Sequence, residues 1–183
     1  MTKNQTEQKK ILAVKAANFV EPGMLLGLGT GSTVDIFIST LGEKFGGLNN
    51  LEIVPTSLDS ADKASKLGMK ILEPKTDLRP DLLIDGADEV AADLSMIKGG
   101  GGALLWEKIV AHNSKSRIYM ADSTKLVREL GHFPLPVEVI SFGHEWTYTA
   151  LKKIFSVVTI RKTAGENFFK TNSGNVIYDC QIG

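Results

Sequence analysis

The chain has 183 residues, with 21 Lys and Arg balanced by 21 Asp and Glu, so its formal net charge is zero. This length suits one domain, or one domain with a small appendage, and the balanced charge argues against a nucleic-acid binder, which usually carries a basic excess. The single cysteine, Cys180, excludes an internal disulfide, a cysteine metal cluster and a paired redox site.

The first two thirds of the chain predict alternating helices and strands. Apolar residues recur there at helical spacing, and glycines or capping residues bound the segments. Helices are predicted over residues 6–20, 32–45, 57–68 and 102–112. Short apolar strands are predicted over residues 24–28, 51–54, 69–72, 82–85 and 117–121. The alternation predicts an α/β fold with a Rossmann-like, mostly parallel sheet and helices on both faces.

The sequence changes character after Gly131. The elements expected there are an extended connector over 133–139, a helix over 144–155, a strand over 157–161 and a hairpin around 172–175. We therefore predict two domains: a larger α/β domain over residues 1–130, which holds the candidate site, and a smaller α+β, ferredoxin-like domain over residues 131–183.

Neither a secretory signal nor a membrane span is predicted. The first ten residues are polar, and no segment has eighteen consecutive apolar residues. We therefore expect a cytoplasmic protein.

A glycine-rich turn at residues 27–33 (GLGTGST) connects a predicted strand to a predicted helix. Backbone N–H groups of such a turn can approach an anion closely, and the hydroxyl groups of Thr30, Ser32 and Thr33 suit a phosphomonoester. A dinucleotide site would need a third glycine where Ser32 stands and an acidic residue at the end of the second strand. A P-loop would need Gly-Lys-Ser/Thr, which does not occur in the chain. The alternative is a tight strand–helix turn without a ligand.

Two carboxylates and a second glycine-rich turn form another candidate site. Asp85 and Asp88 follow the apolar strand 82–85, and residues 98–102 (KGGGG) precede the helix 102–112. Carboxylates at the carboxyl end of a strand can accept hydrogen bonds from sugar hydroxyl groups. A metal site is disfavoured because no histidine is close in sequence. Each aspartate alone would also fit a helix cap in a turn.

Glu107 lies about one turn into the helix after the glycines. Because helical side chains lean toward the N-terminus, its carboxylate is expected over the glycine loop and Lys98, where it would act as a general base. The helical pattern alone favours an exposed glutamate instead, with Lys108 as a solvated neighbour. Lys125, near another strand end, fits either an anion contact or a surface lysine.

Four motifs occur along the chain: GTGST at 29–33, DGADE at 85–89, KGGG at 98–101 with EKI at 107–109, and FPLPVEV at 133–139. Their types and their order resemble those of type A ribose-5-phosphate isomerases. The chain resembles this family over essentially its whole length, through residues 172–177 (NSGNVI). The resemblance implies an isomerase that interconverts ribose 5-phosphate and ribulose 5-phosphate in the non-oxidative pentose phosphate pathway, without metal or cofactor, as a homodimer.

The resemblance also implies the roles of individual residues. Glu107 is expected to move a proton between C2 and C1 of the sugar through an enediolate, and Asp85, Asp88 and Lys98 to hold the sugar, assist ring opening and stabilise the enediolate. The expected substrate contacts are Thr30, Gly31, Ser32, Thr33, Asp85, Gly86, Ala87, Asp88, Lys98, Gly99, Gly100, Gly101 and Lys125.

Two departures from the family pattern stand out. Family members often have Arg before the catalytic Glu, where this chain has Trp106, whose side chain is expected to point away from the pocket. They also usually continue a few dozen residues past Cys180, so the small domain is expected to be C-terminally incomplete at Gly183.

The alternative function is a non-catalytic sugar-phosphate sensor of the same fold, although Glu107 favours catalysis. A coenzyme A transferase is disfavoured because its catalytic Glu context is absent.

Overall fold

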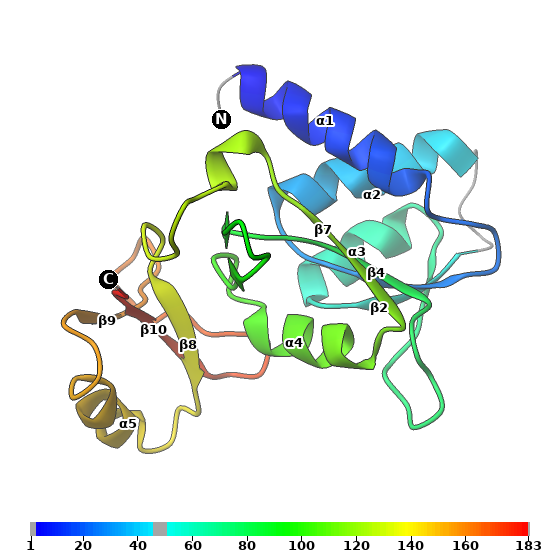
Figure 1. Cartoon of the computed structure of the whole chain (residues 1–183). Coiled ribbons are helices and arrows are strands. Elements are labelled where there is room, and N and C mark those ends of the chain that lie inside the picture. Colours follow the sequence, from blue (N-terminus) through cyan, green and yellow to red (C-terminus); the bar gives the residue numbers. More distant parts are fainter. Residues whose placement is uncertain (1–2, 46–50, 183) are drawn as a thin grey trace. The chain divides into compact units, whose positions relative to one another are not determined.

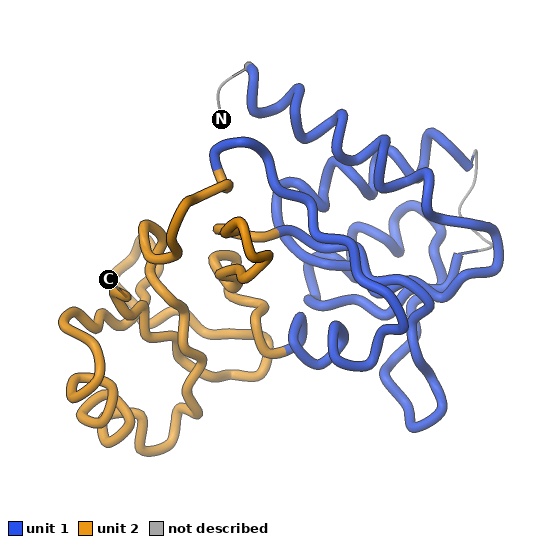
Figure 2. The backbone as a smooth tube through the Cα atoms, in the orientation of Figure 1, with its two compact units in different colours: residues 1–86, 106–124 blue, residues 87–105, 125–183 orange. Residues whose placement is uncertain are grey.

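The computed structural model describes residues 3–45 and 51–182. The chain forms two compact units, each assembled from two stretches of sequence (Figure 2). Unit 1 comprises residues 1–86 and 106–124, and unit 2 comprises residues 87–105 and 125–183. The two units differ from the two domains expected from the sequence, because residues 87–105 and 125–130 belong to unit 2. The domain boundary at residue 130 stays a prediction, and the chain end at Gly183 lies outside the described residues.

Unit 1 is built on a five-stranded sheet in the order β3-β2-β1-β4-β7, with every neighbouring pair parallel (Figure 1). Its strands are β1 (Leu25–Leu28), β2 (Glu52–Pro55), β3 (Lys70–Ile71), β4 (Leu82–Gly86) and β7 (Ser116–Met120). Its helices are α1 (Lys3–Ala17), α2 (Ser32–Phe45), α3 (Leu58–Lys66) and α4 (Leu104–Asn113), the last of which starts in unit 2. The Rossmann-like parallel sheet predicted from the sequence is confirmed.

Both faces of this sheet are covered by helices. On one face, α1, α2 and α3 bury a large cluster that includes Phe37, Leu41 and Ile84. On the other face, Val110 and Ala111 of α4 pack against Leu25, Val54 and Leu83. Successive strand residues point to opposite faces, so the apolar runs predicted as buried strands supply both cores.

Local sequence signals explain the starts of two helices. The apolar residues of α2 recur at helical spacing and are all buried, as Val34, Phe37, Ile38 and Leu41. Ser57 caps α3: its side chain accepts from the Ser60 N–H, and the Ser60 side chain accepts from the Ser57 N–H. Both helices begin where the sequence predicts. The first helix starts and ends three residues earlier than predicted, and turns over residues 18–20 follow its end at Ala17.

Unit 2 contains a three-stranded antiparallel sheet in the order β8-β10-β9. Its elements are β8 (Leu135–Val139), α5 (His144–Leu151), β9 (Val158–Ile160) and β10 (Val176–Cys180). Tyr148 and Leu151 of α5 pack onto a core of Val139, Val176 and Tyr178. The small α+β unit expected near the C-terminus is therefore present.

Three features of unit 2 differ from the prediction. The extended connector over 133–139 is largely a strand, β8, because every residue from Leu135 to Val139 has a partner in β10. Helix α5 ends at Leu151 instead of near Phe155, and turns follow it. A short hairpin of β5 (Glu89–Val90) and β6 (Met96–Ile97) was not predicted, because two-residue strands leave no periodic signal. A short 3-10 turn, η1 (Ser123–Lys125), follows β7.

Within the described residues, no helix combines the length and the apolar character that crossing a bilayer requires.

Candidate active site

Hydroxyl groups cluster at the carboxyl ends of β1 and β2. The Thr30 hydroxyl donates to Ser57 Oγ over 2.9 Å and lies 2.8 Å from the hydroxyl of Thr56. Thr56 and Ser57 are buried, with exposed fractions of 0% and 4%. The sequence indicated no site residue at the end of β2, where a dinucleotide site would need an acidic one. The structure shows that this strand end instead fixes the orientation of Thr30.

Asp85 joins this cluster from the end of β4. Its carboxylate is fully buried, and Oδ1 accepts from the N–H groups of Thr30 at 3.2 Å and Gly86 at 2.7 Å. The approach depends on Gly29, because a Cβ at that position would lie 2.1 Å from Asp85 Oδ1. The first glycine turn and the first aspartate, 55 residues apart in sequence, are thus brought together within unit 1.

The start of α2 carries the remaining polar residues of the first glycine turn. Gly31 has a φ of +104°, a left-handed conformation that favours glycine, and no atom lies within 4 Å of the place a Cβ would take. Ser32 is exposed, Thr33 is half-buried, and the Ser32 hydroxyl accepts a hydrogen bond from Lys9 Nζ over 2.9 Å. Backbone N–H groups at a helix start together with a cation form an arrangement that suits an anion.

Lys9 was missed by the sequence analysis. Its side chain extends from α1, and the residue is only 7% exposed, which is rare for lysine. A signal was available in the sequence, because Lys9 precedes Leu12 and Ala13 by three and four residues. That spacing puts it on the buried face of the first helix.

Glu107 lies in the first turn of α4 and is 5% exposed. It shares the buried face of the helix with Val110 and Ala111, which pack against the sheet. Because β4 and β7 are parallel and α4 connects them, the helix starts on the side of the sheet where β4 ends. The alternative of an exposed glutamate is therefore wrong, although its neighbour Lys108 is exposed.

Unit 2 brings the second aspartate to the second glycine turn. The Asp88 N–H donates to the Ile97 carbonyl over 2.9 Å, across the β5–β6 hairpin. The Gly100 N–H in turn donates to Asp88 Oδ2 over 2.7 Å. A Cβ on Gly100 would lie 2.5 Å from Asp88 Oδ1, so the contact requires glycine.

Apart from Lys125, the other predicted site residues of unit 2 directly neighbour Asp88 or lie in the second glycine turn. Lys98 is half-buried and directly follows β6. Gly99 is buried with a φ of +104°, whereas Gly101 is exposed. Ala87 and Lys125 are half-buried, and Lys125 ends η1. Among the residues that the structure describes, no three His, Cys, Asp or Glu side chains gather as a metal site would require.

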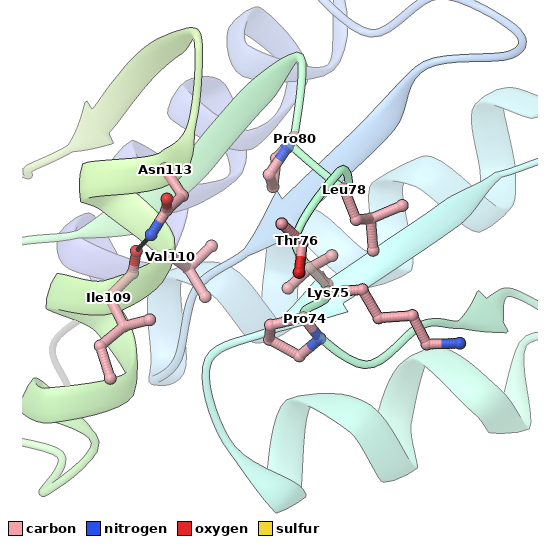
Figure 3. Close-up of a pocket in the computed structure, with 9 residues that line it drawn as sticks. Pro74, Lys75, Thr76, Leu78, Pro80, Ile109, Val110 and Asn113 are labelled. Atoms are coloured by element: carbon pink, nitrogen blue, oxygen red, sulfur yellow. Dashed lines mark hydrogen bonds between the residues drawn. The ribbon is translucent and has the colours of Figure 1, made fainter.

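A pocket in unit 1 lies apart from all of these residues. Its lining residues are Val54, Pro74, Lys75, Thr76, Leu78, Pro80, Ile109, Val110 and Asn113 (Figure 3). The loop after β3 and the later part of α4 form its walls, and the Asn113 side chain donates to the Ile109 carbonyl over 2.8 Å. No predicted site residue lines this pocket, so it is not the site that the sequence indicates.

Comparison with known proteins gives consistent matches. Residues 52–183 match the family model of ribose 5-phosphate isomerase A (phosphoriboisomerase A). A curated ribose-5-phosphate isomerase A from Parvibaculum lavamentivorans is 46% identical, over 98% of this chain and 80% of that protein. The structure of ribose 5-phosphate isomerase A from Methanocaldococcus jannaschii matches with a TM-score of 0.90 at 34% identity, over 97% of this chain and 80% of that one.

A further solved structure was determined with a bound small molecule. It is a D-ribose-5-phosphate isomerase in complex with phospho-erythronic acid, and it matches with a TM-score of 0.90 at 36% identity. The match covers 97% of this chain and 79% of that one.

Proposed function

Since this chain belongs to the ribose 5-phosphate isomerase A family, we propose that Glu107 is the base with which it interconverts D-ribose 5-phosphate and D-ribulose 5-phosphate. The chain is an aldose–ketose isomerase, and this reaction belongs to the non-oxidative pentose phosphate pathway. The burial of Glu107 carries the proposal: a carboxylate 5% exposed, on the side of α4 that faces the sheet. In open α/β sheets, ligands bind outside the carboxyl ends of the strands, which is the end where α4 begins.

The proposed reaction transfers one proton between two carbons of the open-chain sugar. The Glu107 carboxylate removes the proton from C2 of the aldose, and the electrons of that bond form a C1–C2 double bond and leave negative charge on O1. The hydroxyl proton then moves from O2 to O1, and Glu107 returns its proton to C1 to give the ketose. Fixed donors and cations that face the enediolate oxygens lower the barrier for both proton transfers.

The two aspartates and Lys98 are proposed to hold and polarise the sugar. Asp85 and Asp88 each have one oxygen already fixed by a backbone N–H, so each carboxylate is oriented before substrate arrives. They would accept hydrogen bonds from sugar hydroxyls and assist ring opening, while Lys98 would stabilise charge on the enediolate. The backbone of Gly86, Ala87, Gly99 and Gly101 is proposed to complete the sugar contacts.

The phosphate is proposed to bind at the start of α2. The N–H groups of Gly31, Ser32 and Thr33 would donate to its oxygens, with the Thr30 hydroxyl beside them. Lys9 supports this proposal, because its buried ammonium group hydrogen-bonds Ser32 within the same turn. Lys125 is proposed as a second cation for the phosphate.

The test is isomerase activity of the purified chain beside Glu107→Gln. The amide keeps the size of the side chain but cannot accept the proton, so kcat should fall by at least about 10²-fold. The variant should still bind phospho-erythronic acid, a sugar-acid phosphate that cannot isomerise. Glu145→Gln is the matched control, because Glu145 also lies in the first turn of a helix but is exposed, and it should keep full activity.

Two results would contradict the proposal. Activity of Glu107→Gln within several-fold of the wild type would remove Glu107 from the role of base. A wild-type chain that binds ribose 5-phosphate without converting it would indicate a sensor, for which the relatives named above give no support because all of them are isomerases.

A homodimer in the cytoplasm is proposed as the working form of the enzyme. Large exposed apolar side chains in unit 2 support self-association: Ile140, Phe142 and Trp146 are 69%, 89% and 79% exposed. A metabolic substrate that carries a phosphate supports the compartment, because such sugars are made and used inside cells.

A further inference from the structure

The second glycine turn has no side chains with which to hold its own conformation. Residues 99–102 are four consecutive glycines, and glycine has the greatest conformational freedom of any residue. Gly99 and Gly102 both have positive φ values, +104° and +80°. A loop of this kind is ordered only through its backbone groups or by packing from outside.

Arg161 supplies such a contact. Its Nη1 donates to the carbonyl of Gly99 at 3.0 Å and to the carbonyl of Gly100 at 3.1 Å. The guanidinium group also lies 5.9 Å from the ring centre of Phe169, and that ring fills the place that a Cβ on Gly102 would take. One side chain therefore holds two successive carbonyls of the loop.

Arg161 is itself fixed by Asp179. Nε donates to Asp179 Oδ2 over 2.9 Å, and Nη2 forms a second hydrogen bond with Asp179 Oδ1. The arginine and aspartate side chains are 15% and 21% exposed. The Arg161 N–H also donates to the Ile177 carbonyl of β10 over 2.8 Å. A paired guanidinium–carboxylate contact of this kind sets both position and orientation.

The peptide group between Gly99 and Gly100 contacts Arg161 on one side and Asp88 on the other. In a trans peptide, the carbonyl and the following N–H point in opposite directions. The Gly99 carbonyl points to Arg161, and the N–H of the same peptide group, that of Gly100, donates to Asp88 Oδ2. The next peptide group has its carbonyl on Arg161 as well, so the Gly101 N–H points to the side opposite the arginine.

We propose that Arg161 is a positioning residue for the isomerase reaction: it turns the Gly99 and Gly100 carbonyls toward itself, and so aims two backbone N–H groups at Asp88 and the sugar. Asp179 holds the guanidinium group in the orientation this requires. The inference rests on the proposed role of Asp88 in binding the sugar. Arg161 does not itself touch the substrate, and it acts through the loop.

The first test is steady-state kinetics of Arg161→Lys. Lysine keeps the charge but lacks the planar guanidinium group with its several N–H donors, so it cannot hydrogen-bond Asp179 and both glycine carbonyls at once. A small displacement of reacting groups costs about 10–100-fold, and we expect a loss of this size in kcat with KM changed much less. Lys162→Met is the matched control, because the side chain of the adjacent Lys162 forms an exposed ion pair with Glu166, and its loss should leave kcat unchanged.

A double-mutant cycle with Asp88→Asn separates positioning from general destabilisation. If Arg161 acts through Asp88, Arg161→Lys should change kcat less than about 3-fold in the Asp88→Asn background. If the kcat losses of the two single variants multiply fully in the double variant, the inference is overturned. An unchanged kcat of Arg161→Lys in the otherwise native chain would overturn it as well. An Asp88→Asn variant with full activity would instead contradict the proposed function.

A second variant covers the case in which Arg161→Lys does not fold. Arg161→Met combined with Asp179→Leu removes both charges together and leaves neither one buried alone. Its unfolding temperature shows whether the fold is kept. A folded double variant with wild-type kcat would overturn the inference, and one with the loss of kcat expected for Arg161→Lys would support it.

Discussion

At the scale of single residues, Lys9 is the least expected member of the candidate site. A buried ammonium group is costly unless hydrogen bonds or an opposite charge compensate for the lost water. Lys9 donates to Ser32 at the start of α2, and that helix end already has a positive partial charge. The proposed phosphate site gives a reason for a cation at this place, because an anion bound there would face both Lys9 and the helix start.

Replacing this lysine should weaken substrate binding more than it slows the chemical step. Lys9→Met keeps much of the apolar volume but removes one charge-assisted hydrogen bond, which contributes about 1.5–3 kcal/mol. We expect KM for ribose 5-phosphate to rise about 10–100-fold while kcat changes only a few-fold. The measurement is an initial-rate series over substrate concentration. Lys10→Met, the exposed neighbour, is the control; an unchanged KM in Lys9→Met would contradict the assignment.

At the scale of elements, Asp81 connects the first residues of two adjacent strands. It directly precedes β4, and its carboxylate accepts from the Leu25 N–H of β1 over 2.9 Å and from Lys115 Nζ over 2.6 Å. The Lys115 hydrogen bond, with the Leu25 N–H, holds the pKa of Asp81 below its ordinary value. A depressed pKa means that the contribution to stability is present above the ordinary pKa of aspartate and is lost as pH falls through the lowered value.

The unfolding temperature of Asp81→Asn should therefore differ from that of the wild type only at higher pH. At pH 7 we expect it to be about 1–4 °C lower, since the contact is partly exposed and contributes like a single hydrogen bond. As pH falls below the ordinary aspartate pKa of about 3.9 and then through the lowered value, the two unfolding temperatures should converge. Asp77→Asn, in the exposed loop before β4, serves as the control. If the difference in unfolding temperature between the wild type and Asp81→Asn stays constant down to pH 2, the ionised Asp81 carboxylate is not its source.

Elements with strong local signals were predictable from the sequence, and contacts between distant residues were not. The stripe of Val34, Phe37 and Leu41 predicts α2, and Ser57 predicts the start of α3, because both signals lie within a few residues. The strand β8 was seen only as extended chain, since its partner β10 lies about 40 residues later. The same holds for the candidate site. Short sequence motifs predicted its residues, whereas the hydrogen bond from Arg161 to the Gly99 carbonyl joins residues 62 positions apart, and no local sequence pattern indicates it.

At the scale of the whole molecule, the exposed apolar residues of unit 2 lead to a prediction of oligomeric state. Phe142 and Trp146 are far more exposed than such side chains usually are in a protein that stays monomeric. Light scattering coupled to gel filtration should give twice the mass of the chain at micromolar concentration. A mass equal to one chain across the accessible concentrations would contradict the proposed homodimer.

The short β5–β6 hairpin has a consequence for the order of folding. The contacts that join Asp88 to Ile97 and to Gly100 span at most 12 positions in sequence. Closing a loop of this size costs little entropy and is fast compared with pairing of distant strands. The contacts of Asp88 with Ile97 and with the second glycine turn can therefore form early on the nascent chain, before Arg161 and β10 have been synthesised.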